Sequence, residues 1–428
     1  MAAGVSVTRL ANGLTVVSHE MAHLASAAVG VWVNVGSRAE NRDQNGLTHL
    51  LEHMAFKGTR RRSAQGIAEE IEAVGGELNA ATSVENTAYY ARIIAEDMPL
   101  AVDILSDILQ DSTFDEEELR REKHVILQEL GAARDVPEDW VFDLFQETAW
   151  PNQAIGRPIL GTPGTVRNFA RPQLNSYLGT HYRAPSMVLS AAGALSHDGL
   201  VRLAEDHFST LSSERGPEAP PAVYHGGERH EFRDSMETQI VLGFEGVPYT
   251  SEDRHAAQLF ASVLGGGMSS RLFQEIREKR GLCYSIYAFH WAYSDTGVFA
   301  IHAATGEEDI ATLMPVMFDE LERVASDISE EELARSRAQT RASLLMSMES
   351  PAARASQIAR QVLAYGRPLE LEEILDQIAS VTVDDIRTIA ARLLTGSLPT
   401  LVSVGHDKGL PGIGDIQSRF AGSMAALV

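Results

Sequence analysis

Two histidines and a glutamate stand close together early in the chain, in the run His49-Leu50-Leu51-Glu52-His53. In a helix, residues four apart share a face, so the imidazoles of His49 and His53 project side by side. Zinc prefers tetrahedral nitrogen and oxygen ligands, and one helical turn supplies two of them. Glu52 lies about 100° around the helix from His53, where a carboxylate can act as general base on water without binding the metal. We interpret the run as half of a zinc site; two surface histidines beside an acid are the alternative.

A hydrolytic zinc site needs a third protein ligand and one open position for water. Glu129 is the candidate, because Glu122 and Glu129 are seven residues apart and share one face of a predicted helix. The apolar residues 125–127 indicate that this helix is partly buried, and a buried carboxylate without a cation is costly. A solvated acidic stripe is the alternative. His124 lies on another face and is expected at the surface.

Helices and strands of recognisable pattern surround these residues. Residues 13–17 and 27–35 are rich in β-forming side chains, whereas 46–56, which contains the histidine pair, has a helical pattern. The elements follow no strict strand-helix-strand rhythm, which favours an α+β fold with largely antiparallel sheets packed with helices. The other predicted elements are a helix over 63–74 that stops at Gly75-Gly76, strands within 79–94, and helices over 98–110 and 116–130.

A linker divides the chain nearly in half. Residues 212–221 are rich in Ser, Glu, Gly and Pro, a composition that favours an extended segment. Short motifs recur on its two sides: 114–119 resembles 328–333 at an offset of 214, and 156–158 matches 366–368 at an offset of 210. We predict two homologous domains. The N-terminal, zinc-binding domain spans 1–212, the interdomain linker 213–228, and the C-terminal domain 229–428.

The composition excludes several classes of protein. Of 428 residues, 44% are hydrophobic and 22% charged, which are ordinary values for globular domains, and no run approaches the about 18 apolar residues of a membrane span. The formal charge of −23 disfavours nonspecific binding to nucleic acid or anionic lipid and favours basic partners. A single cysteine, Cys283, permits no internal disulfide, and the first ten residues lack the layout of a secretory signal. We therefore expect a cytoplasmic protein.

Three stretches together carry a family resemblance: 46–59, 76–83 and 121–130. On these residues the chain resembles the pitrilysin family of inverted-motif zinc peptidases, most closely the β-type subunits of processing peptidases and their bacterial relatives, from about residue 9 to about residue 367. In that family the third ligand follows the second histidine by about 76 residues, and here 129 − 53 = 76. The resemblance implies a half-clamshell of two homologous domains. It also implies His49, His53 and Glu129 as Zn²⁺ ligands, Glu52 as the base, and Glu122 as a supporting acid.

The resemblance also assigns residues outside the zinc motif. Arg277 and Tyr284 match the arginine and tyrosine, seven apart, with which family members engage the substrate from the second domain. A guanidinium and a phenol are suitable donors for an oxyanion that develops during attack. The strand around Asn79 and Ala80 is expected to pair with an extended substrate through main-chain hydrogen bonds. At the position that the repeat aligns with Glu129 the second half has Ser343, so no second metal site is expected.

The expected reaction is hydrolysis of peptide bonds, in which Zn²⁺ activates water and Glu52 takes its proton and passes it to the leaving amine. Family members enclose peptides in a closed chamber of four such halves, so the expected substrates are unfolded peptides or presequence-like segments, and the acidic charge favours basic ones. One chain carries both the zinc motif and the Arg277 and Tyr284 pair. A homodimer is therefore the simplest assembly, with a heterodimer containing an α-like subunit as the alternative.

Three other functions are weaker interpretations. Relatives that have lost their metal ligands serve as noncatalytic structural or partner subunits, but His49, Glu52, His53 and Glu129 are intact here, and the glycines at 265–267 form a shorter stretch than in such partners. A thiol hydrolase would rest on Cys283, around which no nucleophile motif occurs. A nucleotide-dependent activity is unsupported, because neither a phosphate-loop nor a dinucleotide glycine pattern is present.

Overall fold

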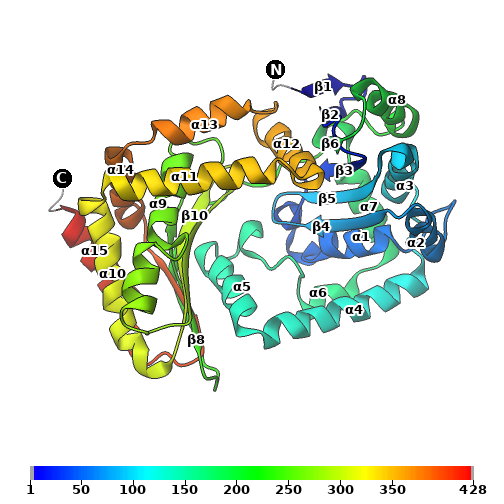
Figure 1. Cartoon of the computed structure of the whole chain (residues 1–428). Coiled ribbons are helices and arrows are strands. Elements are labelled where there is room, and N and C mark those ends of the chain that lie inside the picture. The colour runs from blue at the N-terminus through cyan, green and yellow to red at the C-terminus, as the bar shows by residue number, and fades with distance from the viewer. Residues whose placement is uncertain (1–3, 426–428) are drawn as a thin grey trace. The chain divides into compact units, whose positions relative to one another are not determined.

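The computed structural model describes residues 4–425, which form two compact units, each assembled from separated stretches of the chain. The first unit contains residues up to Leu130, Arg157–Pro220 and Leu344–Glu373; the second contains Gly131–Gly156, Pro221–Ser343 and the residues from Ile374 onward. Each unit is built around its own sheet (Figure 1). Among the described residues, no helix is both long and apolar enough to cross a membrane.

The sheet of the first unit has six strands, and all but one of its neighbouring pairs are antiparallel. Buried side chains fill both faces of the central strands, as expected for a sheet with helices on each side. In sheet order the strands are β1 (Val5–Arg9), β2 (Thr15–Glu20), β6 (Met187–Gly193), β3 (Ser26–Val33), β5 (Thr87–Ile94) and β4 (Glu77–Thr82).

Helices cover this sheet and enclose a large apolar core. The helices are α1 (Leu47–Ala55), α2 (Ala64–Ala73), α3 (Met98–Gln110), α4 (Glu116–Asp135), α6 (Pro163–Asn168), α7 (Arg171–His181), α8 (His197–Phe208) and α12 (Pro351–Tyr365). Short 3-10 turns lie between them at η1 (Ser37–Ala39), η2 (Arg42–Gln44), η3 (Ala95–Asp97) and η5 (Ala184–Ser186).

The second unit has a five-stranded sheet in the order β7 (Gly227–Glu231), β11 (Thr400–Val404), β8 (Thr238–Glu245), β10 (Gly297–Thr305) and β9 (Ser285–Ala292). Its own apolar core fills the space between sheet and helices. The remaining elements are α5 (Pro137–Ala149), η4 (Ala154–Gly156), α9 (Arg254–Gly265), the π-helical segment η6 (Phe273–Glu278), η7 (Glu307–Asp309), α10 (Ile310–Asp327), α11 (Glu330–Ser347), α13 (Leu371–Ser380), α14 (Val383–Thr395) and α15 (Ile413–Ala425).

The two sheets have the same topology, which confirms the predicted repeat of an α+β domain. If β1 is left out and the strands of each sheet are numbered in chain order, both sheets have the strand order 1-5-2-4-3. In both, the single parallel pair joins the first and fifth strands, β2 with β6 and β7 with β11. The recurring acidic motifs open equivalent helices, α4 and α11, each with three glutamates in its first turn.

Each repeat gives one helix to the sheet of the other repeat. Helix α12 comes from the second repeat but packs on β6, β3 and β2, where Ile358 and Val362 join an apolar cluster with Val17, Trp32 and Val188 (Figure 1). Helix α5 comes from the first repeat but packs on β11, β8 and β7. The predicted boundaries 1–212, 213–228 and 229–428 describe the repeat in the sequence, whereas the compact units differ from them by these exchanged segments.

Because Gly243 of β8 has no side chain, α5 can approach its sheet closely. A Cβ atom on Gly243 of β8 would lie 2.4 Å from the ring of Phe145. On the same helix, the ring of Phe142 packs on Phe289, Trp291 and His302. Aromatic contacts of this kind contribute beyond their buried area, so α5 is firmly bound to the second sheet.

Candidate metal centre

Helix α1 carries the His49-Leu50-Leu51-Glu52-His53 run, and a buried glutamate fixes where this helix begins. Its N-cap, Gly46, has a φ of 93°, in the left-handed region that glycine adopts without strain. The Glu40 carboxylate accepts hydrogen bonds from the backbone N–H groups of Gly46 at 2.8 Å and Thr48 at 2.7 Å. Burial raises the pKa of Glu40 to about 7, although these hydrogen bonds act in the opposite direction. Glu40 thereby fixes the start of the helix, at Leu47, two residues before His49.

Replacing Glu40 by alanine is expected to destabilise the protein by about 2–4 kcal/mol, because two buried N–H groups at the start of α1 lose their acceptor. Glu40→Gln is expected to cost less, since an amide oxygen can still accept one of these bonds. Denaturant unfolding monitored by circular dichroism measures both changes. The exposed Asp43, in the adjacent turn, provides the control: Asp43→Ala should stay within about 0.5 kcal/mol of the parent. Equal stability of Glu40→Ala and the parent would exclude this role.

The structure brings His49, His53 and Glu129 together, as predicted. Nε2 of His49 lies 3.9 Å from Oε2 of Glu129, and Nε2 of His53 lies 3.7 Å from the same oxygen. One ligand atom from each residue lies within 4.8 Å of those of the other two. The histidines come from α1 and the glutamate from α4, so both helices are needed to form the cluster.

A further contact defines which nitrogen atom of His53 faces the cluster. Nδ1 of His53 lies 3.0 Å from Oε2 of Glu122, and because a carboxylate only accepts, this nitrogen is the donor. A neutral His53 ring then presents the lone pair of Nε2 toward Glu129. Burial, followed by the proximity of His53, lowers the pKa of His49 to about 4, so this ring is neutral at pH 7.

The three groups fit a metal cation. The Glu129 oxygen lies 3.7–3.9 Å from the two imidazole nitrogens, which is longer than a hydrogen bond, so the three atoms converge without a hydrogen bond from Glu129 to either histidine. A tetrahedral zinc ion with bonds of about 2.0–2.1 Å sets its ligands about 3.3 Å apart, a few tenths of an ångström closer than here. The buried Nδ1 of His49 also lacks a hydrogen-bond partner within the described residues. A cation is the group that would satisfy all three ligand atoms.

Glu52 lies beside this cluster and is held by a residue that the sequence analysis did not single out. The Thr82 hydroxyl, at the end of β4, donates a hydrogen bond of 2.5 Å to Oε2 of Glu52. Burial raises the pKa of Glu52, while the hydrogen bond from Thr82 works in the opposite direction. Thr82 therefore holds the Glu52 carboxylate beside the cluster.

Asn79 and Ala80 lie on β4, the last strand in the order of the first sheet. Asn79 is exposed and Ala80 is partly exposed. The side chain of Asn79 accepts a hydrogen bond of 2.8 Å from the N–H of Ala80. An extended peptide that paired with this N–H would replace that contact. Pairing of a substrate with β4 stays a prediction.

Arg277 and Tyr284 belong to the second unit, where they contact each other. The guanidinium carbon of Arg277 lies 5.1 Å from the centroid of the Tyr284 ring and 4.7 Å from that of Phe273. Tyr284 is 75% exposed. The two aromatic faces hold the guanidinium by cation–π contact and leave its N–H donors available. The role of this pair in substrate binding stays a prediction.

The other residues considered from the sequence have ordinary surroundings. His124 is exposed on α4, as predicted, and lies 3.4 Å from the Gln128 amide. Burial raises the pKa of the Cys283 thiol to about 11, which makes it a poor nucleophile. The sequence analysis missed Glu40, Thr82 and Lys57. Of these, only Lys57 and Thr82 lie in the stretches that carry the family resemblance.

An α+β chain of two repeats, with a His-x-x-Glu-His helix and a third carboxylate from a second helix, defines the class of zinc peptidases with the inverted motif. A family model described as insulinase, peptidase family M16, matches residues 15–163. A second model, described as the peptidase M16 inactive domain, matches residues 168–340. The chain belongs to the M16 peptidase family, which confirms the resemblance seen in the sequence.

Individual relatives agree with this assignment. The chain is 40% identical over 401 residues to an uncharacterized zinc protease of Rickettsia felis, covering 94% of this chain and 97% of that protein. It is 36% identical over 426 residues to the human mitochondrial-processing peptidase subunit beta, covering 96% and 87% of the two chains. A protease from Helicobacter pylori has a similar fold, with a TM-score of 0.86, 21% identity and coverage of 94% and 99%.

Proposed function

We propose that the protein is a zinc-dependent endopeptidase that hydrolyses unfolded peptides. The observation that carries this proposal is the convergence of His49, His53 and Glu129, with no hydrogen bond from Glu129 to either histidine, next to the carboxylate of Glu52. These donors match the nitrogen and oxygen ligands that zinc prefers in hydrolases. The printed names of the relatives, zinc protease and processing-peptidase subunit beta, support the same activity.

In the proposed mechanism His49, His53 and Glu129 hold the zinc ion. Zinc in such a site acts as a Lewis acid and lowers the pKa of water toward about 7. Glu52, held in place by Thr82, accepts a proton from the attacking water and then donates that proton to the leaving amine. Its raised pKa favours both transfers, because a base that is too weak would not hold the proton between them.

The second unit would contribute donors to the reaction. Arg277 makes no ion pair with any residue that the structure describes, and its guanidinium is held against Tyr284 and Phe273. We assign Arg277 and Tyr284 the stabilisation of the oxyanion that forms on the scissile carbonyl. We also propose that β4, around Asn79 and Ala80, aligns the substrate as an added strand.

The substrates and the assembly form the finer part of the proposal. The net charge of −23 favours peptides that carry Arg or Lys, as presequences do. An extended peptide satisfies strand pairing, whereas a folded protein does not, and this requirement agrees with enclosure of the substrate in a chamber. We propose a homodimer as the assembly, because one chain carries the zinc motif together with Arg277 and Tyr284.

A noncatalytic partner subunit is the second candidate function. The family model that matches residues 168–340 is described as an inactive domain, which favours that role for the second repeat. In this repeat Ser343 stands at the position that aligns with Glu129. The complete set of donors on α1 and α4 favours catalysis in the first repeat. The two candidates predict opposite results in one assay.

The zinc-loaded protein is expected to cleave an unstructured basic peptide, to lose this activity when a chelator removes the metal, and to regain it when zinc is restored. A matched peptide with every Arg replaced by Gln should be cleaved more slowly, and the same segment inside a folded protein should not be cleaved. Mass spectrometry of the products measures all of these rates.

Light scattering on the same sample should give twice the chain mass of 46.6 kDa. A protein that binds zinc but cleaves no peptide would favour the function of a noncatalytic partner subunit. Equal cleavage rates for the two peptides would exclude selection by charge. A monomeric mass would exclude the homodimer.

A further inference from the structure

The loop that follows α1 is attached to the segment that precedes α4. Residues 56–63 connect α1 to α2, and within them Thr59 forms an antiparallel bridge with Ser112. The carbonyl of Gly58 accepts hydrogen bonds from the backbone N–H of Thr113 at 3.1 Å and from its hydroxyl at 3.2 Å. Gly58 has a φ of 111°, which requires glycine at this turn. The loop therefore joins the helix of the two histidines to the start of the helix of Glu129.

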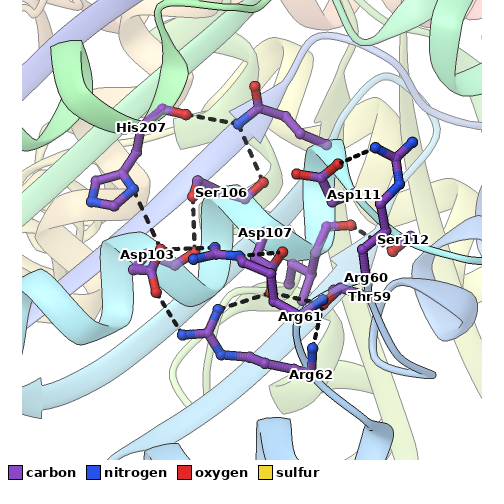
Figure 2. A network of polar contacts seen from close by, with 12 residues as sticks. Thr59, Arg60, Arg61, Arg62, Asp103, Ser106, Asp107, Asp111, Ser112 and His207 are labelled. Carbon is purple, nitrogen blue, oxygen red and sulfur yellow. Dashed lines mark hydrogen bonds and ion pairs between the residues drawn. The ribbon is translucent and has the colours of Figure 1, made fainter.

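Charged residues fix this loop to α3 (Figure 2). Asp107, whose side chain is fully buried, accepts hydrogen bonds from the Thr59 hydroxyl at 2.8 Å, from Arg62 at 2.8 Å and from Arg61 at 3.1 Å. Asp103, one helical turn away, binds both arginines as well, at 2.8 and 2.5 Å. Figure 2 shows these side chains converging from the loop and from α3. Each arginine bridges both carboxylates, and charge-assisted hydrogen bonds of this kind restrict both partners, so the network holds the loop against α3. We call Thr59, Arg61, Arg62, Asp103 and Asp107 the arginine clamp.

Lys57, two residues before the clamp, reaches the metal centre indirectly. Its ammonium lies 2.8 Å from Oε1 of Glu122, while Oε2 of the same carboxylate accepts the Nδ1–H of His53 at 3.0 Å. Glu122 is 6% exposed, so it depends on these two partners for its charge and its hydrogen bonds. Burial alone would raise the pKa of Glu122, but the bonds from Lys57 and His53 outweigh burial and lower it.

The geometry gives Lys57 a specific role. A carboxylate that binds only His53 could rotate about its last torsion and offer either oxygen, whereas Lys57 holds Oε1 and leaves Oε2 for the imidazole. A partner of this kind sets both the tautomer and the ring orientation of a ligating histidine. Lys57 is in turn placed by the loop that the arginine clamp holds.

We propose that Lys57 is a positioning residue of the metal centre: it holds Glu122 so that His53 presents Nε2 to the ion, and the arginine clamp fixes Lys57 relative to α1 and α4. This inference rests on the proposed function only in taking zinc as the ion. It assigns Lys57 no contact with the substrate or with the metal.

The test measures zinc affinity by competition with a chromogenic chelator, together with kcat and KM for a peptide. Lys57→Met is expected to weaken zinc binding by about 10–100-fold, the usual effect of losing a residue that supports a metal ligand. Once zinc is saturating, kcat is expected to recover to near the parent value with KM unchanged. Lys57→Arg keeps a cation within reach of Glu122 and is expected to restore most of the affinity. The matched control is Arg60→Met in the same loop, whose side chain is 80% exposed and lies 3.4 Å from Asp111.

A double-mutant cycle with Glu122→Gln separates positioning from a general loss of stability. If Lys57 acts through Glu122, the affinity of Lys57→Met/Glu122→Gln will equal that of Glu122→Gln alone. Additive losses, or a Lys57→Met variant that binds zinc as tightly as the parent, would overturn the inference. Circular dichroism of the metal-free variants shows whether the fold is kept; if Lys57→Met unfolds, Lys57→Gln takes its place in the cycle. A parent protein that binds no zinc would refute the proposed function itself, a result distinct from any of these.

Discussion

A Glu52→Gln variant is expected to bind zinc as the parent does and to lose between about 10²- and 10⁴-fold in kcat for peptide hydrolysis. The amide has the shape of the carboxylate and can still accept the hydrogen bond from Thr82. It cannot take a proton from water. Because Glu52 lies outside the group of His49, His53 and Glu129, the metal ligands are unchanged. Zinc content per chain and single-turnover cleavage of a fluorogenic peptide measure the two properties separately.

The control for this variant is Glu72→Gln, since Glu72 is an exposed glutamate on α2 that should affect neither property. Loss of zinc together with activity would mean that Glu52 is a ligand rather than a base. Full activity with zinc bound would remove Glu52 from the mechanism and would leave Thr82 holding a carboxylate without a role.

Replacement of Glu129 by alanine should have the largest effect on the metal. Two imidazoles from one helical turn would remain, and the only ligand from α4 would be lost. We expect zinc affinity to fall by more than about 100-fold, the upper range for residues that only support a ligand. At a zinc concentration of about 100 times the parent's Kd, the parent gains about 2.7 kcal/mol from the metal, and the variant should lose most of this gain. Thermal unfolding with and without zinc measures the difference.

His124→Ala provides the comparison for Glu129→Ala, because His124 lies on the same helix but is exposed. If both variants bind zinc as the parent does, the convergence of the three groups has another cause. In that case the hydrolase proposal loses its main support, while the family membership of the chain remains.

The sequence predicts which side chains lie together best where they are close in the chain. His49, Glu52 and His53 lie within one helical turn, so their relation follows from helix geometry alone. Glu129 was predicted as the third ligand from helical periodicity and from the spacing in the family, and in the structure α4 places it near the two histidines. The strands and helices of the first repeat up to residue 130 were also predicted from the sequence, because their hydrophobic patterns are strong.

The missed residues depend on contacts between distant segments. Glu40 is eight residues from Thr48 in the chain, and nothing in its neighbours predicts that it binds the start of α1. Thr82 meets Glu52 only because β4 lies beside α1. Lys57 shares a short motif with the histidines, but its partner Glu122 is 65 residues away, so its function appears only in three dimensions.

The exchange of α5 and α12 between the two sheets could not be predicted from the sequence, for a different reason. An amphipathic helix has the same sequence pattern whichever apolar surface it covers. Helices α5 and α12 lie at equivalent places in the two repeats, but each packs on the sheet of the other repeat. Sequence similarity between the halves therefore gave no information about which sheet receives which helix.

This exchange affects how the protein can be made and divided. A fragment that stops at the linker lacks α12, so Val17, Trp32 and Val188 would face water on one side of the first sheet. During synthesis the same surface is exposed until the ribosome has added about 140 further residues beyond the linker, because Val362 is among the last residues to cover it. The first half of the gene therefore does not encode an autonomous folding unit, and its product is expected to need chaperones or the second half in trans to stay in solution.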